Sequence, residues 1–164
     1  MILNSPYISG SLTVTGNTTY ADTLVLDGAK SIVISGTGFD TVRGSAAGAD
    51  TITGLASTDL IYGNGGDDVF KYSNIATTGT IVGGDGADMV YYTGCGALSL
   101  ANAQGIETLS LNTSSTGIQA ITLGAATATT LISGDTSNQT ISMQSDLSGV
   151  TVSLGADSND TLTL

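Results

Sequence analysis

Five nine-residue segments of the sequence carry an aspartate at their sixth position and an apolar residue at their eighth. They span residues 35–43, 45–53, 54–62, 63–71 and 83–91. The aspartates are Asp40, Asp50, Asp59, Asp68 and Asp88, and the apolar residues are Val42, Ile52, Ile61, Phe70 and Val90. Because a repeated carboxylate builds up negative charge along the structure, the chemistry that this spacing favours is the binding of cations.

The overall charge supports the same interpretation and excludes other functions. The 164 residues include 14 acids and three basic residues, which gives a net charge of −11, and 13 of the acids are Asp. Nucleic acid is excluded as a partner because its phosphates would be repelled. The chain has no His and one Cys, Cys95. It therefore offers neither an internal disulfide nor a Cys–His nucleophile, and we do not expect an enzyme.

The elements that position these aspartates are short strands. Sixteen runs rich in apolar residues and Thr recur about every ten residues, from "SLTV" at 11–14 to "TLTL" at 161–164. Each run is bounded by Gly, Asn, Asp or Ser, which is typical of a strand followed by a turn. Strands at this spacing fit a sandwich, a barrel or a solenoid. No stretch approaches the roughly 18 apolar residues of a membrane-spanning helix, so we expect no membrane insertion.

The Gly and Asp pattern decides between these folds. "GNGGDDVFK" at 63–71 and "GGDGADMVY" at 83–91 resemble the nonapeptide G-G-x-G-x-D-x-U-x of the RTX (repeats-in-toxin) calcium-binding proteins. The segments at 35 and 45 match in part, and the segment at 54 is degenerate. The resemblance implies an all-β, right-handed parallel β-solenoid, a calcium β-roll that grades into a β-helix. Two nonapeptides would form one coil, with the eighth residue pointing inward.

The resemblance also implies a set of calcium ligands in the turns. Glycine-rich turns expose carbonyl oxygens, and Asp adds a carboxylate, which together are the oxygen donors that Ca²⁺ prefers. The implied metal-binding residues are the five aspartates above together with Asp67, Asp85, Gly36, Gly38, Gly48, Gly63, Gly65, Gly66, Gly83, Gly84 and Gly86. In any solenoid, however, Gly and Asp turns can serve only to reverse the chain, and the segment at 54 keeps that alternative open.

If successive nonapeptides alternate between the two edges of the solenoid, every second aspartate stacks on the same edge. Asp40 and Asp59 then share one edge, while Asp50, Asp68 and Asp88 share the other. Asp22 and Asp160 are in phase with the nonapeptides, and Asp157 lies three residues before Asp160; all three are candidate ligands, although their turns lack the full motif.

The sequence divides into three parts of one continuous solenoid. Residues 1–34 form N-terminal coils, residues 35–92 form the calcium-binding roll, and residues 93–164 form a Ser/Thr-rich β-helix that ends in a partial nonapeptide. The third part resembles the "I-E-x-L-x-L" β-helical segments of RTX-type bacterial S-layer proteins and large surface adhesins. A plain β-helix needs no acids, because its backbone hydrogen bonds join neighbouring coils around a stack of aliphatic side chains.

These resemblances imply a function outside the cell. We expect a calcium-binding structural protein of a bacterial surface, such as an S-layer, filament or adhesin segment, whose folding depends on calcium. Self-association or contact with neighbouring coils is expected because "DTLTL" at the C-terminus reads as a bare strand edge. The alternative is a non-catalytic calcium-binding module of a secreted enzyme.

Overall fold

The structure, a computed structural model, is described for the following residues: 2–3, 11–15, 23–26, 31–35, 41–46, 48–53, 59–72, 79–111, 119–124, 131–133, 138–143, 150–155 and 159–163. Every regular element among these residues is a β-strand. None of the described residues forms a helix long and apolar enough to cross a membrane.

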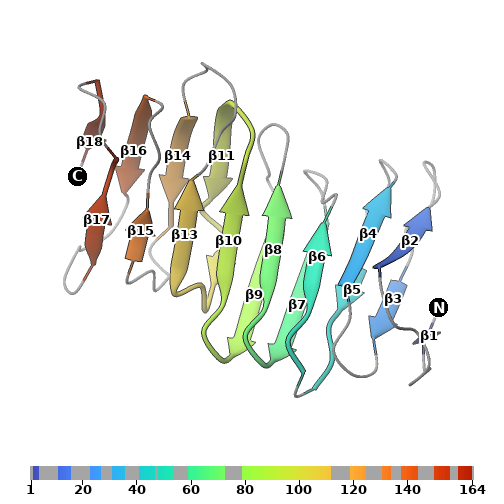
Figure 1. Cartoon of the computed structure of the whole chain (residues 1–164). Coiled ribbons are helices and arrows are strands. Elements are labelled where there is room, and N and C mark those ends of the chain that lie inside the picture. The colour runs from blue at the N-terminus through green and yellow to red at the C-terminus, as the bar shows by residue number, and fades with distance from the viewer. Residues whose placement is uncertain are drawn as a thin grey trace.

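The described strands form three parallel sheets (Figure 1). The six-stranded sheet contains β1 (Ile2–Leu3), β3 (Thr23–Leu26), β5 (Thr41–Arg43), β7 (Leu60–Gly65), β9 (Thr80–Asp85) and β12 (Ala103–Gln104). The eight-stranded sheet contains β2 (Ser11–Thr15), β4 (Ser31–Ser35), β6 (Thr51–Thr53), β8 (Val69–Tyr72), β10 (Met89–Tyr92), β13 (Thr108–Leu111), β15 (Leu131–Ser133) and β17 (Thr151–Ser153). The four-stranded sheet contains β11 (Gly96–Leu100), β14 (Gln119–Leu123), β16 (Gln139–Met143) and β18 (Thr161–Thr163).

The chain coils from one sheet into another and back, so that each strand pairs with the equivalent strand of the next coil. Thr51 lies beside Val69, and Val69 lies beside Met89. Figure 1 shows the eight-stranded sheet as one layer and the other two sheets behind it, with the two chain termini at opposite ends of the stack. The predicted all-β parallel solenoid is therefore confirmed.

Columns of apolar side chains fill the space between the layers. Ile52, Phe70, Val90 and Leu109 pair in register along the eight-stranded sheet, and each is fully buried. Each such side chain contributes about 1.5–3 kcal/mol relative to its exposed state. The eighth residue of each nonapeptide points inward as predicted, because Val42 and Ile61 are buried in the same way.

The coil between β10 and β13 departs from the predicted alternation of two strands. It contains β11, which begins the four-stranded sheet, and the two-residue strand β12, which ends the six-stranded sheet. The sequence predicts a strand at 97–100 and none at 103–104. The segment "ANAQ" lacks β-branched residues, so nothing in its composition indicates a strand. The backbone of β9 supplies the pairing partner, since Ala103 lies beside Ile81.

Candidate metal centre

The candidate site lies along the turns that lead from β5, β7 and β9 into β6, β8 and β10. We call this line of turns the lower edge, after its place in Figure 1. Asp50, Asp68 and Asp88 each occupy the residue directly before a strand of the eight-stranded sheet. The strand register therefore places the three aspartates in one column, as the sequence predicts.

Hydrogen bonds from backbone to side chain join the members of this column. The amide of Asp50 donates to Oδ1 of Asp68 at 2.7 Å, and the amide of Asp68 donates to Oδ1 of Asp88 at 2.8 Å. The amide of Asp88 donates to Oε2 of Glu107 at 2.8 Å. We call these four residues the carboxylate ladder. The carboxylates of Asp68, Asp88 and Glu107 are each held by the backbone of the preceding coil, so the stacking of the coils fixes their positions.

Backbone hydrogen bonds hold the same residues from the other side. The carbonyl of Asp50 accepts from the amide of Val69, and the carbonyl of Asp68 accepts from the amide of Met89, both at 2.8 Å. The three aspartates are at most 1 % exposed. They are therefore structural parts of the coil as well as candidate ligands.

The second oxygen of two of these carboxylates has no hydrogen-bond partner. Oδ2 of Asp68 and Oδ2 of Asp88 are buried and unpartnered in the described part of the chain. In Asp50, by contrast, Oδ2 accepts from the amide of Ser45 at 2.7 Å. A buried charged oxygen without a partner is costly, and a cation is the usual compensation.

The unpartnered oxygens face a carbonyl oxygen of the next coil across a point that only glycine leaves open. A Cβ built on Gly63 would press against both Oδ2 of Asp68 and the carbonyl oxygen of Gly83. A Cβ built on Gly83 would press against Oδ2 of Asp88 and the carbonyl oxygen of Gly105. Carboxylate and carbonyl oxygens that converge in this way are the hard donors that Ca²⁺ takes. The residues present therefore fit a calcium ion.

Electrostatics oppose this arrangement unless a cation is bound. Burial raises the pKa of Asp68 from 3.8 to about 6; the hydrogen bond from the Asp50 amide lowers it in part, and the neighbouring charges raise it further. Burial also raises the pKa of Asp88, and the charge of Glu107 adds to that effect against the hydrogen bond from the Asp68 amide. A bound cation would reverse the effect because it favours the ionised carboxylates.

Backbone oxygens must supply a large part of any coordination shell. Among the described residues, no three His, Cys, Asp or Glu side chains gather closely enough to hold a metal by themselves. Ca²⁺ takes 6–8 oxygen ligands, including backbone carbonyls. The donors of the lower edge have that mixed character, with about one carboxylate for each turn.

Glycine allows the tight turns of the lower edge. Gly66, Gly84 and Gly86 have φ angles of 107°, 116° and 137°. These values lie in the region that residues with a Cβ avoid. Gly65 donates its amide to the carbonyl of Ser45 at 3.4 Å, and Gly48 donates its amide to the Ser45 hydroxyl at 3.0 Å. The predicted glycines in these turns therefore shape the backbone around the ladder.

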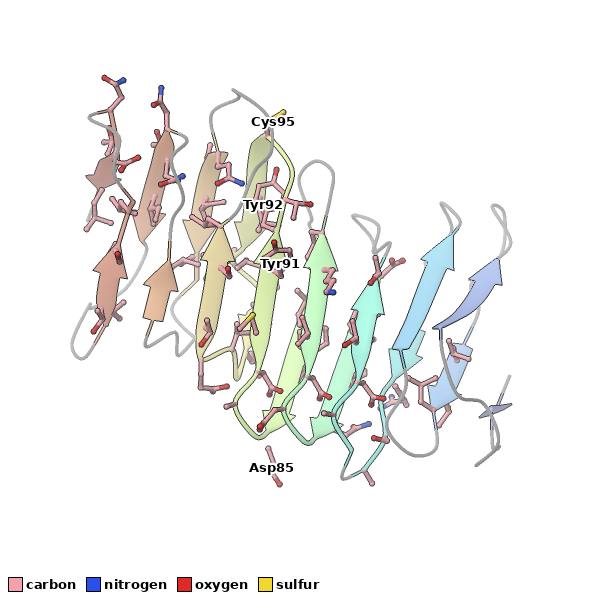
Figure 2. All side chains as sticks on the ribbon, viewed as in Figure 1. Asp85, Tyr91, Tyr92 and Cys95 are labelled. Carbon is pink, nitrogen blue, oxygen red and sulfur yellow. The ribbon has the colours of Figure 1, made fainter. Side chains whose placement is uncertain are left out.

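Two other predicted ligands on the lower edge lie outside the ladder. The side chains of Asp67 and Asp85 are exposed, and Figure 2 shows Asp85 pointing away from the turns. Oδ1 of Asp67 accepts from the amide of Ala87 at 2.9 Å, and the carbonyl of Asp85 accepts from the amide of Gly66 at 2.9 Å. Besides burial, the charge of Asp67 nevertheless raises the pKa of Asp68 and of Asp88, so its carboxylate lies within electrostatic reach of the ladder.

The opposite edge carries Asp59, directly before β7 in the six-stranded sheet. Asp59 is buried, and its carbonyl accepts from the amide of Thr80 at 3.0 Å. The structure therefore separates Asp59 from the Asp50, Asp68 and Asp88 column, as the sequence predicts. The remaining predicted site residues lie outside the described residues: Asp22, Asp40, Asp157, Gly36 and Gly38.

The C-terminal coils carry a largely neutral counterpart of the ladder at the start of the four-stranded sheet. The amide of Gln139 donates to Oδ1 of Asp160 at 2.9 Å. Nε2 of the buried Gln119 donates to the carbonyl of Gly94 at 2.9 Å. Asp160 thus makes the same kind of contact as Asp68, but with a glutamine in the coil before it.

Sequence reasoning missed one member of the carboxylate ladder, Glu107. Its signal was its place in the register: it stands directly before β13 and 19 residues after Asp88. The nonapeptide motif has Asp at its sixth position, so it does not identify a Glu that lies outside any nonapeptide.

Comparison with known families explains the chemistry of this edge. Residues 34–70 match the family model of the RTX calcium-binding nonapeptide repeat, which holds four copies. The chain contains RTX calcium-binding repeats. RTX nonapeptide repeats bind calcium ions, and they form structural rather than catalytic modules. The matched range includes Asp50, Asp59 and Asp68 and ends before Asp88. The carboxylate of Asp88 nevertheless accepts a hydrogen bond from the amide of Asp68, just as the carboxylate of Asp68 accepts one from the amide of Asp50. No curated protein and no solved structure matches the chain.

Proposed function

We propose that this chain is a calcium-stabilised structural segment of a bacterial surface protein, secreted in a loosely folded state and ordered by calcium outside the cell. The observation that carries the proposal is the pair of buried, unpartnered oxygens on Asp68 and Asp88, each facing a carbonyl of the next coil. RTX repeats occur in secreted bacterial proteins, which supports an extracellular location.

Charge repulsion explains why folding would require calcium. Neighbouring strands lie about 4.8 Å apart. Two like charges at that separation repel by about 3 kcal/mol at an effective dielectric constant of 20. The ladder stacks four acids, and the chain has only three basic residues. Binding of a divalent cation between turns would replace this repulsion with attraction, and its free energy would add to that of folding.

The proposed ligands of the lower edge are Asp50, Asp68 and Asp88, with carbonyl oxygens from the glycine turns. This edge would hold about two ions in the nonapeptide region, because each ion lies between two stacked turns. The opposite edge would hold about one ion between Asp40 and Asp59. We also propose that Asp22 extends the opposite edge by one coil.

The parts of the chain would differ in their dependence on calcium, for the same electrostatic reason. Residues 35–92 would be the calcium-dependent roll, and residues 93–164 would be a β-helix that needs no calcium for its core. The hydrogen bond from the amide of Gln139 to Asp160 supports this division, because a neutral residue there avoids stacked charges. Residues 1–34 would extend the roll at its N-terminal end.

Self-association would follow from the exposed end of the stack. Thr161, Leu162 and Thr163 are exposed, and Leu162 is 38 % exposed although its partner Ile141 is buried. An open edge of this kind can pair with another strand. The N-terminal coil of a second molecule would supply one, and head-to-tail contacts of this type build filaments or sheets such as an S-layer.

Light scattering of the purified chain tests this assembly. Wild-type chain should form larger particles at millimolar Ca²⁺, and the double variant Asp157→Asn/Asp160→Asn should not. A wild-type chain that stays monomeric at high calcium would end the self-assembly proposal. It would instead favour a segment whose neighbouring coil is supplied by a longer protein.

A second candidate function is a non-catalytic calcium-binding module attached to a secreted enzyme. The RTX match favours it as much as a surface role. The β-helix after residue 93 favours the surface role. It makes up a large part of the chain and contains coils without nonapeptides, whereas an accessory module would consist of nonapeptides throughout. Electron microscopy of the chain with calcium separates the two, because an accessory module would not assemble.

Circular dichroism tests the calcium dependence itself. The part of the β signal that residues 35–92 contribute should be lost in excess chelator and regained when millimolar Ca²⁺ is added. Magnesium at the same concentration is the control, because Mg²⁺ demands a smaller octahedral site and dehydrates reluctantly. An unchanged β spectrum in chelator would contradict the proposed function.

A further inference from the structure

We propose that Glu107 is the terminal acidic ligand of one further calcium site, which lies beyond the last nonapeptide, between the turn before β10 and the turn before β13. This inference rests on the proposed function of the lower edge. It extends that function to the coil after the segment 83–91, two coils past the last strand of the matched family range.

Glu107 continues the carboxylate ladder by one coil beyond Asp88. Thr108 pairs with Met89, so Glu107 lies beside Asp88. Met89 pairs with Val69, so Asp88 lies beside Asp68 in the same way. The amide of Asp88 donates to Oε2 of Glu107 at 2.8 Å, just as the amide of Asp68 donates to Asp88 at 2.8 Å. Glu107 thus repeats the same contact without the nonapeptide.

The absence of a side chain at Gly83 leaves a space in which two oxygen donors converge. Oδ2 of Asp88 is buried and has no hydrogen-bond partner among the described residues, and Asp88 is 0 % exposed. A Cβ on Gly83 would press against this oxygen and against the carbonyl oxygen of Gly105. The same pair of donors faces Gly63 one coil earlier, formed by Asp68 and the Gly83 carbonyl. The coil that carries Glu107 therefore supplies a carbonyl to a place of the same construction.

The length of the turn before β13 accounts for a Glu, and not an Asp, at position 107. Gln104 lies beside Val82, so Gly105 stacks on Gly83. From Gly105 the chain reaches Glu107 by way of a single residue, Ile106, whereas four residues separate Gly83 from Asp88. A shorter turn takes the backbone along a tighter path, and the extra methylene of Glu restores the reach of the carboxylate. The hydrogen bond to the Asp88 amide shows that this reach is achieved.

Such a site would couple calcium to the first coil without nonapeptides. The carbonyl of Asp88 accepts from the amides of Glu107 and Thr108, at 3.1 Å and 3.0 Å. An ion held by Asp88, Glu107 and the Gly105 carbonyl would therefore fix the start of β13 as well as the end of the roll. Calcium would order the junction between the two parts of the solenoid.

The test is the calcium stoichiometry and affinity of Glu107→Gln in the full chain. Glutamine keeps an oxygen that can accept from the Asp88 amide but removes the charge. Equilibrium dialysis and titration calorimetry with CaCl₂ should show one ion fewer than wild type, or one ion bound at least about tenfold more weakly. Asp146→Asn is the matched control, since it removes one charge from a residue outside the predicted ligand set and should leave the number of ions unchanged.

The outcomes separate this inference from the proposed function. Wild-type chain that binds no calcium would overturn the proposed function and the inference together. Wild-type chain that binds calcium, with Glu107→Gln binding the same number equally tightly, would overturn only the role of Glu107.

A second measurement applies even where Glu107→Gln fails to fold. Hydrogen exchange of the wild-type chain over residues 103–111 should slow on addition of calcium, over the same concentration range as β8 and β10. Exchange in this segment that does not respond to calcium, while β8 and β10 do respond, would overturn the proposed site.

Discussion

The amide of Asp50 donates a 2.7 Å hydrogen bond to Oδ1 of Asp68, which lies 18 residues further along the chain. The contact joins two successive coils and uses one oxygen of the carboxylate for structure. In Asp68 the other oxygen is left buried and unpartnered. Coil stacking therefore brings the carboxylates together, and ion binding between the coils would stabilise the arrangement that stacking creates.

Replacing Asp68 with Asn should weaken calcium binding more than replacing Asp40. Asp68 lies between Asp50 and Asp88 in the ladder, so it can contribute to ions on both sides. Even residues outside the ligand shell of a metal change its affinity about 10- to 100-fold. We therefore expect a loss of at least about tenfold for Asp68→Asn, measured by calorimetry, with Asp146→Asn as a control outside the predicted ligand set. Equal losses in Asp68→Asn and Asp40→Asn would contradict the edge assignment.

Adding a methyl group at Gly63 should impair both folding and calcium binding. Its Cβ would occupy the point between Oδ2 of Asp68 and the carbonyl of Gly83. Overpacking of this kind costs about 1–3 kcal/mol. Gly63→Ala should therefore lower the free energy of unfolding in calcium by about that amount, as measured by urea denaturation, and should weaken calcium binding.

The control for Gly63 is Gly124→Ala. A Cβ built on Gly124 would press against the carbonyl of Ala101, in the C-terminal part of the solenoid and away from the carboxylate ladder. That variant carries an overpacking cost of about the same size, about 1–3 kcal/mol, without filling the space beside Asp68. If the two variants bind calcium equally well, the open point beside Gly63 has no part in the site.

The calcium-free chain should be more stable at pH 4 than at pH 7. The pKa of Asp68 is raised from 3.8 to about 6 in the folded chain, chiefly by burial. A raised pKa means that the folded state binds the proton more tightly than the unfolded state, so the stabilisation is full below 3.8 and is lost as the pH rises through about 6. Asp88 shifts in the same direction.

Thermal unfolding in chelator measures this effect. The melting temperature should fall between pH 4 and pH 7. In saturating calcium it should rise over the same range, because the cation requires ionised carboxylates. A chelated chain that melts higher at pH 7 than at pH 4 would show that the buried carboxylates do not destabilise the fold.

The sequence predicted the parallel solenoid because its signals are local and repeated. Each nonapeptide places a β-branched or aromatic residue two positions after its Asp, and the burial of Ile52, Phe70 and Val90 confirms the inward direction. The alternation of edges was also predictable, since two segments of about ten residues complete one coil. It places Asp50 and Asp68 in one column and Asp59 on the other edge.

The features that were not predicted depend on register and not on local pattern. Glu107 enters the ladder because Thr108 pairs with Met89, and no residue near Glu107 signals that pairing. The end of the six-stranded sheet was not predicted for a similar reason, since its last strand, β12, is too short and too poor in β-branched residues to be recognised. The exposure of Asp85 was hidden as well, because a motif position does not say which atom of a residue faces the ion.

The two parts of the solenoid should differ in their response to chelator. In the lower edge, Asp50, Asp68 and Asp88 stack as acids, and the loss of calcium leaves their repulsion uncompensated. In the four-stranded sheet the equivalent places hold Gln119 and Gln139, whose side chains carry no charge. The core there is a stack of aliphatic side chains, with Leu98, Ile121 and Ile141 in register and buried.

Hydrogen exchange measured by mass spectrometry resolves the two parts in one experiment. With calcium, both should be protected. With chelator, β8 and β10 should exchange at least about tenfold faster, whereas β14 and β16 should keep most of their protection, because their hydrogen bonds and apolar core do not depend on an ion. If β14 and β16 lose protection together with β8 and β10, the solenoid unfolds as one cooperative unit. The carboxylate ladder then controls the stability of the C-terminal coils too, through the continuous eight-stranded sheet that joins them.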